Sequence, residues 1–171
     1  MHIDDQAVWS DGTPVTADDV IYTALRICSP VIGNVAMMYY VFEGVGDDGF
    51  VEAGADHVEG ITKVDDKTVR FTTKAPMSLI TFKASYARYL MPLPKHVIEN
   101  ISEENLMSDP WFNKPDVVSG PYRVTEFDRD HYVAYEVNKD YWKGAPKIDR
   151  LNIKIVEGSQ LYAGLSQGRS M

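Results

Sequence analysis

The residues from 120 to 156 constrain the fold of this chain more than any other stretch. Apolar and polar side chains alternate there in three successive runs, which is the pattern of half-buried β-strands. The residues expected on one face are Tyr122 and Val124, then Val133, Tyr135 and Val137, then Leu151, Ile153 and Ile155. Three strands with one apolar face form only half of a hydrophobic core, because another layer must cover that face.

Two segments of special composition border these strands. Gly120-Pro121 is typical of a turn, since proline fixes φ and glycine permits conformations closed to other residues. The polar residues 128–130 form the expected hairpin loop, and an aromatic pair, Tyr141-Trp142, lies between the second and third strands. The stretch therefore predicts an antiparallel hairpin followed by an aromatic connection to a third strand.

A helix is predicted after Thr16. Thr16 and Asp19 match the capping-box spacing, and Asp18 and Asp19 fall in the first turn, where the helix dipole favours negative charge. An apolar stripe at helical spacing follows, and Pro30 ends it. We interpret the two aspartates as capping residues rather than as a catalytic pair.

The middle of the chain predicts further short elements. They are strands at 58–64 and 68–74, a helix from Pro76 to about Tyr86, an extended segment to Pro94, short helices opened by Pro94 and Ser102, and a linker at 109–118. A last helix is expected after Ser159.

Composition excludes several classes of function. The net charge of −8 argues against a nucleic-acid partner, whose phosphates require a basic surface. The single cysteine, Cys28, excludes an internal disulfide and a cysteine-based zinc cluster. The 171 residues suit one domain or two small subdomains, no apolar run approaches the roughly 20 residues that span a bilayer, and no signal peptide is visible.

Several metal-binding and cofactor motifs are also missing from the sequence. The four histidines share no metal-ligand spacing, and no Walker A sequence occurs. Residues 44–49 match G-x-G-x-x-G, but two aspartates inside that loop would repel a pyrophosphate. We therefore expect no catalytic residue, no metal and no cofactor, and a binding protein rather than an enzyme.

Aromatic and basic side chains gather in two segments that regular packing explains least. They are Tyr39, Tyr40, Tyr86, Arg88 and Tyr89. Tyrosine and arginine are residue types that hold ligands in clefts, so these five are the candidate solute-binding residues.

Two motifs give the chain a family resemblance. WSDGTPVTADDVIYTALR at 9–26 resembles the DGxPxTAxDV signature of family 5 extracellular solute-binding proteins. SGPYRV, followed by YEVNKDYWKGAPKIDRLNIKIV, is similar to the second signature of that family, and KVDDKTVRFTTKAPMSLI resembles the hairpin and helix between them. The resemblance covers nearly the whole chain and implies an α+β (mixed α/β) fold of the periplasmic-binding-protein-like type II class.

The resemblance also implies a division of the chain. Members of the family are several hundred residues long, so we expect a fragment of lobe I. Residues 1–117 would form a smaller lobe I subdomain with a helix, a β-hairpin and further helices. Residues 118–171 would form part of the lobe I central sheet with a C-terminal helix. The matched motif residues are expected to be structural, and they are Asp11, Gly12, Asp19, Gly120, Pro121, Tyr122, Tyr141 and Trp142.

The function that the resemblance implies is solute capture for an ABC importer outside the cytoplasm. The intact receptor, in the periplasm or as a cell-surface lipoprotein, would close two lobes over a solute, most simply an oligopeptide or dipeptide, and deliver it to the membrane permease. Tyr40, Arg88 and Tyr89 lead the candidates for the cleft wall, and Arg88 suits a carboxylate. A sensory or interaction module with the same fold, and a small hydrolase, are the alternatives. Exposed sheet edges favour self-association of the fragment.

Overall fold

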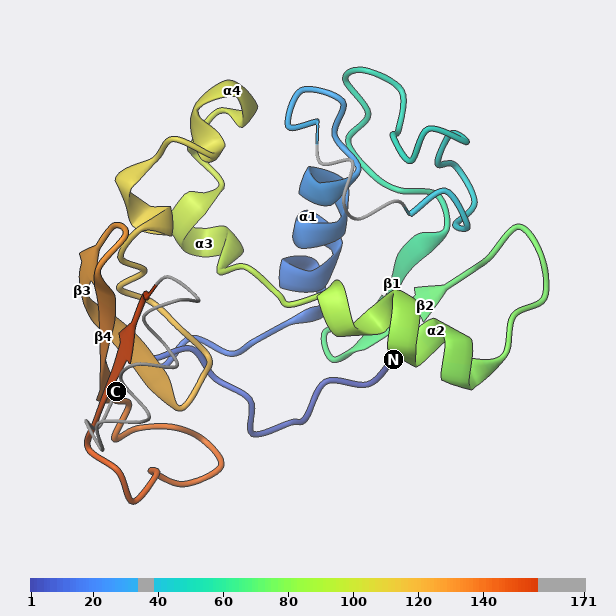
Figure 1. Cartoon of the computed structure of the whole chain (residues 1–171). Coiled ribbons are helices and arrows are strands. Elements are labelled where there is room, and N and C mark those ends of the chain that lie inside the picture. Colours follow the sequence, from blue (N-terminus) through green and yellow to red (C-terminus); the bar gives the residue numbers. More distant parts are fainter. Residues whose placement is uncertain (34–38, 157–171) are drawn as a thin grey trace. The chain divides into compact units, whose positions relative to one another are not determined.

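The computed structural model describes residues 1–33 and 39–156 (Figure 1). It divides into two compact units, unit 1 at Met1–Asp109 and unit 2 at Pro110–Met171. The assignment of residues 1–117 and 118–171 to two parts of one lobe stays a prediction. The helix expected after Ser159 lies outside the described residues.

Unit 1 is built on one helix and one hairpin. Helix α1 (Ala17–Ile27) contacts the antiparallel strands β1 (Ile61–Asp65) and β2 (Thr68–Phe71), beside which it lies in Figure 1. Buried apolar residues between them form the core, and they are Ala17, Val20, Ala24, Cys28, Tyr39, Phe42, Val45, Val51, Val58, Ile61, Val69 and Leu90.

The predicted start of α1 is confirmed. Thr16 is the N-cap residue in an extended conformation, and its backbone N–H donates to the Asp19 carboxylate at 2.8 Å. Asp18 and Asp19 lie in the first turn, as the capping-box spacing indicates. The local sequence therefore specifies where this helix begins.

Gly60 allows a third segment to join the hairpin. The backbone N–H of Gly60 donates to the carbonyl of Glu43 at 2.8 Å, and that of Thr72 donates to the carbonyl of Gly60 at 2.7 Å. A Cβ atom at residue 60 would lie 2.6 Å from backbone atoms of both neighbours. Only glycine fits such a close approach of three backbones.

The other elements of unit 1 are short helices. They are α2 (Leu79–Ser85), the 3₁₀-helix η1 (Ala87–Tyr89), α3 (Lys95–Ile98) and α4 (Glu103–Leu106). The N-caps predicted at Pro94 and Ser102 are confirmed. Two details were wrong. Helix α2 begins after Ser78, whose hydroxyl accepts from the Thr81 N–H at 3.1 Å, rather than at Pro76, and residues 87–89 turn instead of extending.

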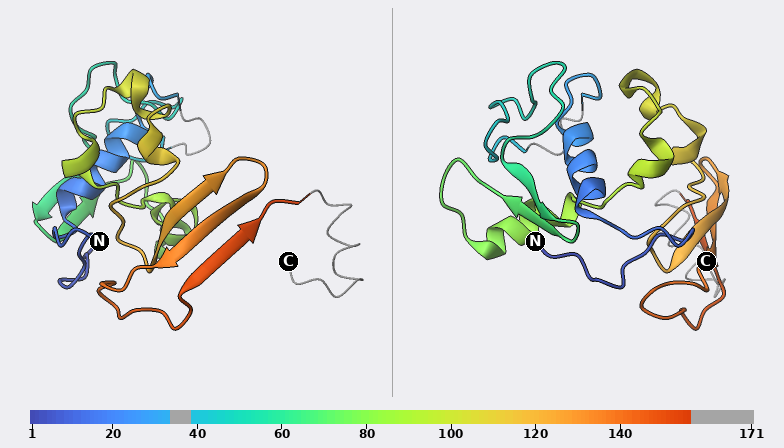
Figure 2. Two further views of the ribbon diagram at one scale, coloured as in Figure 1. Left: turned by 90° about the vertical axis from the view of Figure 1, so that its left-hand side faces the viewer. Right: turned by 180° about the vertical axis from the view of Figure 1, so that it is seen from behind.

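Unit 2 contains the three predicted strands. After the 3₁₀-helix η2 (Pro110–Phe112), strands β3 (Tyr122–Asp128), β4 (Tyr132–Val137) and β5 (Arg150–Lys154) pair antiparallel in the order β3-β4-β5, as Figure 2 shows. The alternation in the sequence therefore predicted this sheet.

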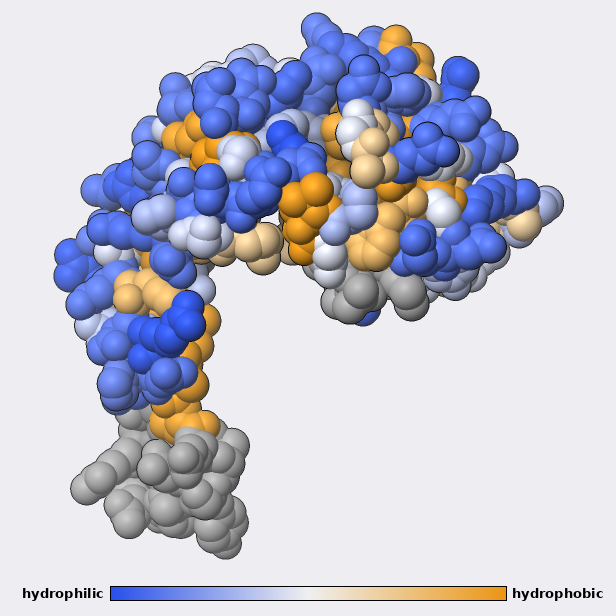
Figure 3. Space-filling view, turned by 90° about the horizontal axis from the view of Figure 1, so that it is seen from above, coloured by the Kyte–Doolittle hydropathy of each residue, from blue (hydrophilic) through white to orange (hydrophobic). Residues whose placement is uncertain are grey.

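One face of the sheet is apolar across all three strands. Val124, Tyr135 and Leu151 are paired neighbours on it, and so are Phe127, Val133 and Ile153. Phe127 reaches this face because the β3–β4 register shifts between Val124 and Glu126, leaving Thr125 as a bulge residue. Phe127 and Ile153 are 41% and 55% exposed, and Figure 3 shows hydrophobic side chains at the surface of this unit.

None of the helices in the described ranges combines the length and the hydropathy needed to cross a membrane.

Candidate functional site

The five candidate binding residues come from two segments of unit 1. Tyr39 and Tyr40 precede Phe42, whereas Tyr86, Arg88 and Tyr89 lie at the end of α2 and in η1. We call these five residues the tyrosine cluster. The turn of η1 positions its members, because the chain coils at 87–89 instead of running on in an extended conformation.

The structure brings Tyr39, Tyr40 and Tyr86 together. The rings of Tyr39 and Tyr86 have centroids 6.3 Å apart, and the Tyr39 hydroxyl donates to the Tyr86 carbonyl at 3.5 Å. The Tyr86 and Tyr40 hydroxyls lie close enough to interact, which contributes to a raised pKa of Tyr86. Residues far apart in the sequence thus form one aromatic surface.

The two adjacent tyrosines differ in their exposure. Tyr39 is 1% exposed and packs against Phe42 in the hydrophobic core, whereas Tyr40 is 42% exposed. Tyr39 therefore lies behind the surface, and Tyr40 presents its ring and hydroxyl to solvent. A ligand of unit 1 would reach Tyr40 and not the ring of Tyr39.

Arg88 and Tyr89 form a stacked pair. The Arg88 guanidinium lies 4.4 Å from the centroid of the Tyr89 ring and donates a hydrogen bond to the Tyr89 hydroxyl. Because guanidinium carries five N–H donors in a planar fork, most of them stay available to a carboxylate. Stacking on the ring limits the directions in which this fork can point.

Two hydroxyls of the cluster, those of Tyr39 and Tyr86, have raised pKa values. Burial, followed by the nearby Cys28 thiol and Tyr89 hydroxyl, raises the pKa of Tyr39 above its ordinary value. Burial and the hydrogen bond with Tyr40 also raise the pKa of Tyr86. A raised pKa keeps the hydroxyls of Tyr39 and Tyr86 neutral near pH 7, so neither of them is a general base there.

The motif residues near the N-terminus make contacts within unit 1. The Asp11 carboxylate accepts from the Thr13 N–H at 2.9 Å and lies 2.8 Å from the His96 ring nitrogen. Gly12 has φ +87°, a conformation that favours glycine, and its N–H donates to the Trp9 carbonyl at 2.9 Å. These contacts agree with a structural role, which stays a prediction.

The motif residues of unit 2 are joined through Asn138. Its backbone N–H donates to the Pro121 carbonyl at 2.8 Å, and its side-chain amide donates to the Gly120 carbonyl at 3.1 Å. The Trp142 indole donates to the Ser119 carbonyl at 3.3 Å. The aromatic pair thus ties the segment after β4 to the turn before β3.

The segment after β4 also contacts Tyr122 of β3 and contains Tyr141. The Tyr122 hydroxyl donates to the Ile148 carbonyl at 3.1 Å, and the rings of Tyr141 and Trp142 lie 5.8 Å apart. Their structural role likewise stays a prediction. In residues 1–33 and 39–156, no three His, Cys, Asp or Glu side chains gather as a metal site would require.

Sequence reasoning missed two sets of residues. Phe71 and Phe82 pack with Phe42 and support the tyrosine cluster from within the core, with ring centroids 5.3–6.3 Å apart. The segment with Trp111 and Lys114, predicted as a plain linker, lines a pocket of unit 2. A tryptophan beside a proline in a linker was the available signal for the second set.

Comparison with known sequences gives a family match over the whole chain. The model of the family described as "Bacterial extracellular solute-binding proteins, family 5 Middle" matches residues 1–171. The dipeptide-binding protein DppE of Bacillus subtilis is 30% identical over 158 residues, which is 90% of this chain and 27% of DppE. The periplasmic oligopeptide-binding protein OppA of Salmonella typhimurium is 26% identical over 151 residues, 86% of this chain and 26% of OppA.

Comparison with solved structures gives a matching fold. The OppA of Haemophilus influenzae, solved in complex with the peptide RPPGFSPFR, superposes with a TM-score of 0.77 at 25% identity. The match covers 98% of this chain and 32% of that protein. This chain therefore spans about a quarter of the length of the curated relatives that it matches.

Proposed function

Since the chain belongs to family 5 of the bacterial extracellular solute-binding proteins, we propose that it forms part of the solute-binding component of an ABC importer. The fold prediction is confirmed: the chain has the α+β fold of part of a type II periplasmic binding protein. The family match over residues 1–171 is the observation that carries the proposal. The whole receptor would act outside the cytoplasm and deliver solute to a membrane permease.

The solute in this proposal is a short peptide. Two relatives have names that specify a dipeptide or an oligopeptide, and the H. influenzae protein holds a peptide. The tyrosine cluster offers suitable chemistry, because aromatic rings pack on peptide side chains and Arg88 can donate hydrogen bonds to a carboxylate. Tyr40, Arg88 and Tyr89 are the residues that we place on the cleft wall, with Tyr86 next to Tyr40 and the buried Tyr39 behind them.

The proposal makes the chain a binding protein without catalytic activity. Receptors of this type close two lobes over the solute, so each lobe contributes only part of the binding free energy. The 171-residue chain by itself should therefore bind peptide weakly. Added peptide should also be recovered uncleaved, which separates this function from the hydrolase alternative.

The test is a titration of the chain with RPPGFSPFR and with shorter peptides, followed by calorimetry and amide NMR. We expect no sub-micromolar affinity, and small saturable shifts at residues 39–42 and 86–89. Tyr40→Ala should reduce those shifts, whereas Tyr132→Ala, a tyrosine of unit 2, should not. Sub-micromolar affinity would overturn the half-receptor proposal. Chemical-shift changes outside both segments would overturn the choice of wall residues.

A further inference from the structure

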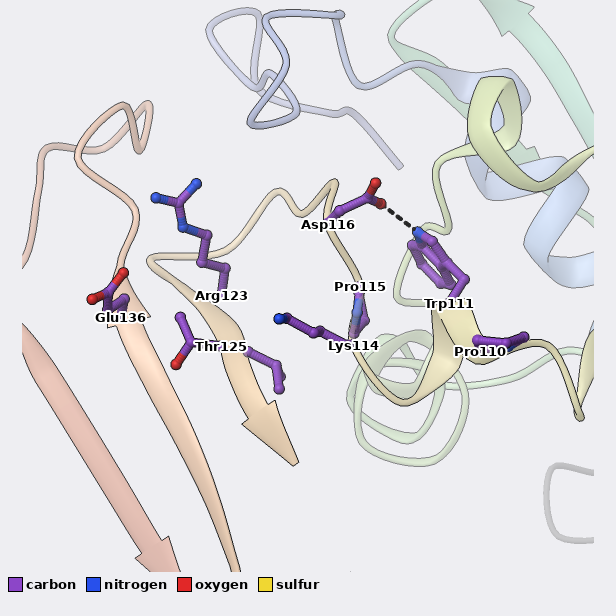
Figure 4. Close-up of a pocket in the computed structure, with 9 residues that line it drawn as sticks. Pro110, Trp111, Lys114, Pro115, Asp116, Arg123, Thr125 and Glu136 are labelled. Atoms are coloured by element: carbon purple, nitrogen blue, oxygen red, sulfur yellow. Dashed lines mark hydrogen bonds between the residues drawn. The ribbon is translucent and has the colours of Figure 1, made fainter. Parts of the chain in front are cut away.

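Unit 2 contains a pocket that the proposed function does not use. Its volume is about 550 Å³, and residues of unit 2 alone line it. The segment 110–116 forms one wall, and strands β3 and β4 form the other (Figure 4). The strand wall includes Arg123 and Glu136, which are paired neighbours, together with Val124 and the bulge residue Thr125.

The wall made by segment 110–116 is held in place by its own contacts. The Trp111 indole N–H donates to the Asp116 carboxylate at 2.9 Å, which joins the two ends of the segment (Figure 4). The rings of Trp111 and Phe112 lie 5.1 Å apart in an edge-on arrangement, and Pro110 and Pro115 each fix one backbone dihedral. A wall ordered in this way costs less conformational entropy when a ligand binds.

The acidic side chains that line the pocket have partners within the protein. Glu136 lies opposite Arg123 on β3 and opposite Arg150 on β5, and it forms its ion pair with Arg150 at 3.0 Å. Asp116 accepts the Trp111 hydrogen bond. Both carboxylates of the lining are thus engaged inside the protein.

The two cationic side chains that line the pocket, Lys114 and Arg123, have no partner among the described residues. Within the described residues, no hydrogen bond or ion pair involves the side chain of Lys114 or Arg123. A pocket that offers two unpaired cations is notable in a chain of net charge −8, which otherwise repels anions. Its available groups are therefore N–H donors next to an apolar wall of Trp111 and Pro115.

We propose that this pocket binds a small organic anion, a carboxylate carried on an aromatic or other apolar group. The guanidinium of Arg123 can hold a carboxylate with two parallel hydrogen bonds, and the Lys114 ammonium can add a third. The body of the ligand would pack on the Trp111 ring. Since both cations are exposed, we expect a dissociation constant on the order of 1 mM.

The experiment compares two probes that differ only in charge. The ¹⁵N-labelled 171-residue chain is titrated with N-acetyl-L-phenylalanine and with its neutral amide, and the indole N–H signal of Trp111, assigned with Trp111→Phe, is followed by NMR. The acid should shift this signal saturably, with at least about fivefold higher affinity than the amide. Equal shifts from both probes, or no saturation, would overturn the proposal.

Matched variants test the role of the two cations. Arg123→Gln should weaken the acid about tenfold, and Lys114→Gln should weaken it by a smaller factor. Arg129→Gln removes the same charge from the exposed hairpin loop outside the pocket and should leave the affinity unchanged. The Lys114 variant stays informative if Arg123→Gln disturbs the sheet, because Lys114 is exposed on the segment 110–116. Equal weakening by Arg129→Gln would show that only net charge matters and would refute the site.

Discussion

Asp19 is the residue whose removal should destabilise unit 1 most clearly. Its carboxylate is 4% exposed and accepts hydrogen bonds from three parts of the chain. The donors are the Trp9 indole at 3.3 Å, the Thr16 backbone N–H at 2.8 Å and hydroxyl at 3.3 Å, and the Lys95 backbone N–H at 3.0 Å. One side chain therefore connects the N-terminal segment, the start of α1 and the start of α3. Asp19→Ala would remove all of these contacts without introducing a larger group.

The expected cost follows from the donors that are left behind. A buried donor without a partner costs about 1–3 kcal/mol, and the Trp9 side chain is buried, so water cannot replace the carboxylate there. Loss of the bond to the Thr16 N–H removes helix capping worth about 1 kcal/mol. Loss of the hydrogen bond from the partly buried Lys95 N–H adds about 1 kcal/mol. Because these three terms share one site and do not add fully, we expect a loss of about 2–4 kcal/mol. That is a large fraction of the 5–15 kcal/mol typical of a domain.

Urea unfolding of the 171-residue chain, followed by circular dichroism, measures this loss as a change in the free energy of unfolding. Asp18→Ala is the matched control, because Asp18 is the preceding residue, is 48% exposed and pairs with Lys63 at 2.7 Å on the surface. Its loss should be below about 1 kcal/mol. Asp19→Asn keeps one acceptor oxygen and should fall between the two. A loss below about 1 kcal/mol for Asp19→Ala, or one equal to that of Asp18→Ala, would refute the reasoning.

Three further predictions concern packing, reactivity and association. Gly60→Ala should lower the free energy of unfolding by about 1–3 kcal/mol in the same urea assay, because a Cβ atom there lies 2.6 Å from backbone atoms. Gly120→Ala, whose Cβ atom would have its nearest neighbour at 3.9 Å, should cost less than about 1 kcal/mol. Equal losses would contradict the steric argument. Burial raises the pKa of the Cys28 thiol to about 12. A thiol-specific reagent at pH 8 should therefore modify the folded chain at least about 100-fold more slowly than the urea-unfolded chain. Similar rates for the two states would show that the thiol is accessible. Sedimentation velocity should show self-association of the chain through the apolar sheet face. Ile153→Lys on that face should weaken the self-association more than Asn152→Lys on the polar face. A strict monomer at high concentration would exclude self-association.

The elements that the sequence predicted well are those with local causes. The start of α1 depends on a capping residue and two aspartates within one turn, and these act whatever the rest of the chain does. The strands of unit 2 follow from alternation, which shows directly which side chains share a face. The start of α2 also has a local cause, although it was predicted wrongly. The helix begins after its N-cap residue Ser78, not at Pro76, which ends the preceding segment.

The features that sequence reasoning missed depend on contacts between distant residues. Tyr39 and Tyr40 are neighbours of the same type, and only the packing of Tyr39 against Phe42 separates a buried ring from an exposed one. The need for glycine at residue 60 arises from two backbones that reach it from elsewhere in the chain. In both cases the sequence carries the residue but not the neighbour that decides its role.

The bulge in β3 connects the fold of unit 2 to the proposed anion pocket. Strict alternation from Val124 would place Glu126 on the apolar face and Phe127 on the polar one. One extra residue, Thr125, reverses this, so that Phe127 pairs with Val133 on the apolar face while Glu126 turns to the polar face. Thr125 itself lines the pocket, and its hydroxyl donates to the Ala134 carbonyl at 3.3 Å across the strands. The apolar face thus requires an irregular strand, and that irregularity also shapes the wall on which Arg123 is presented.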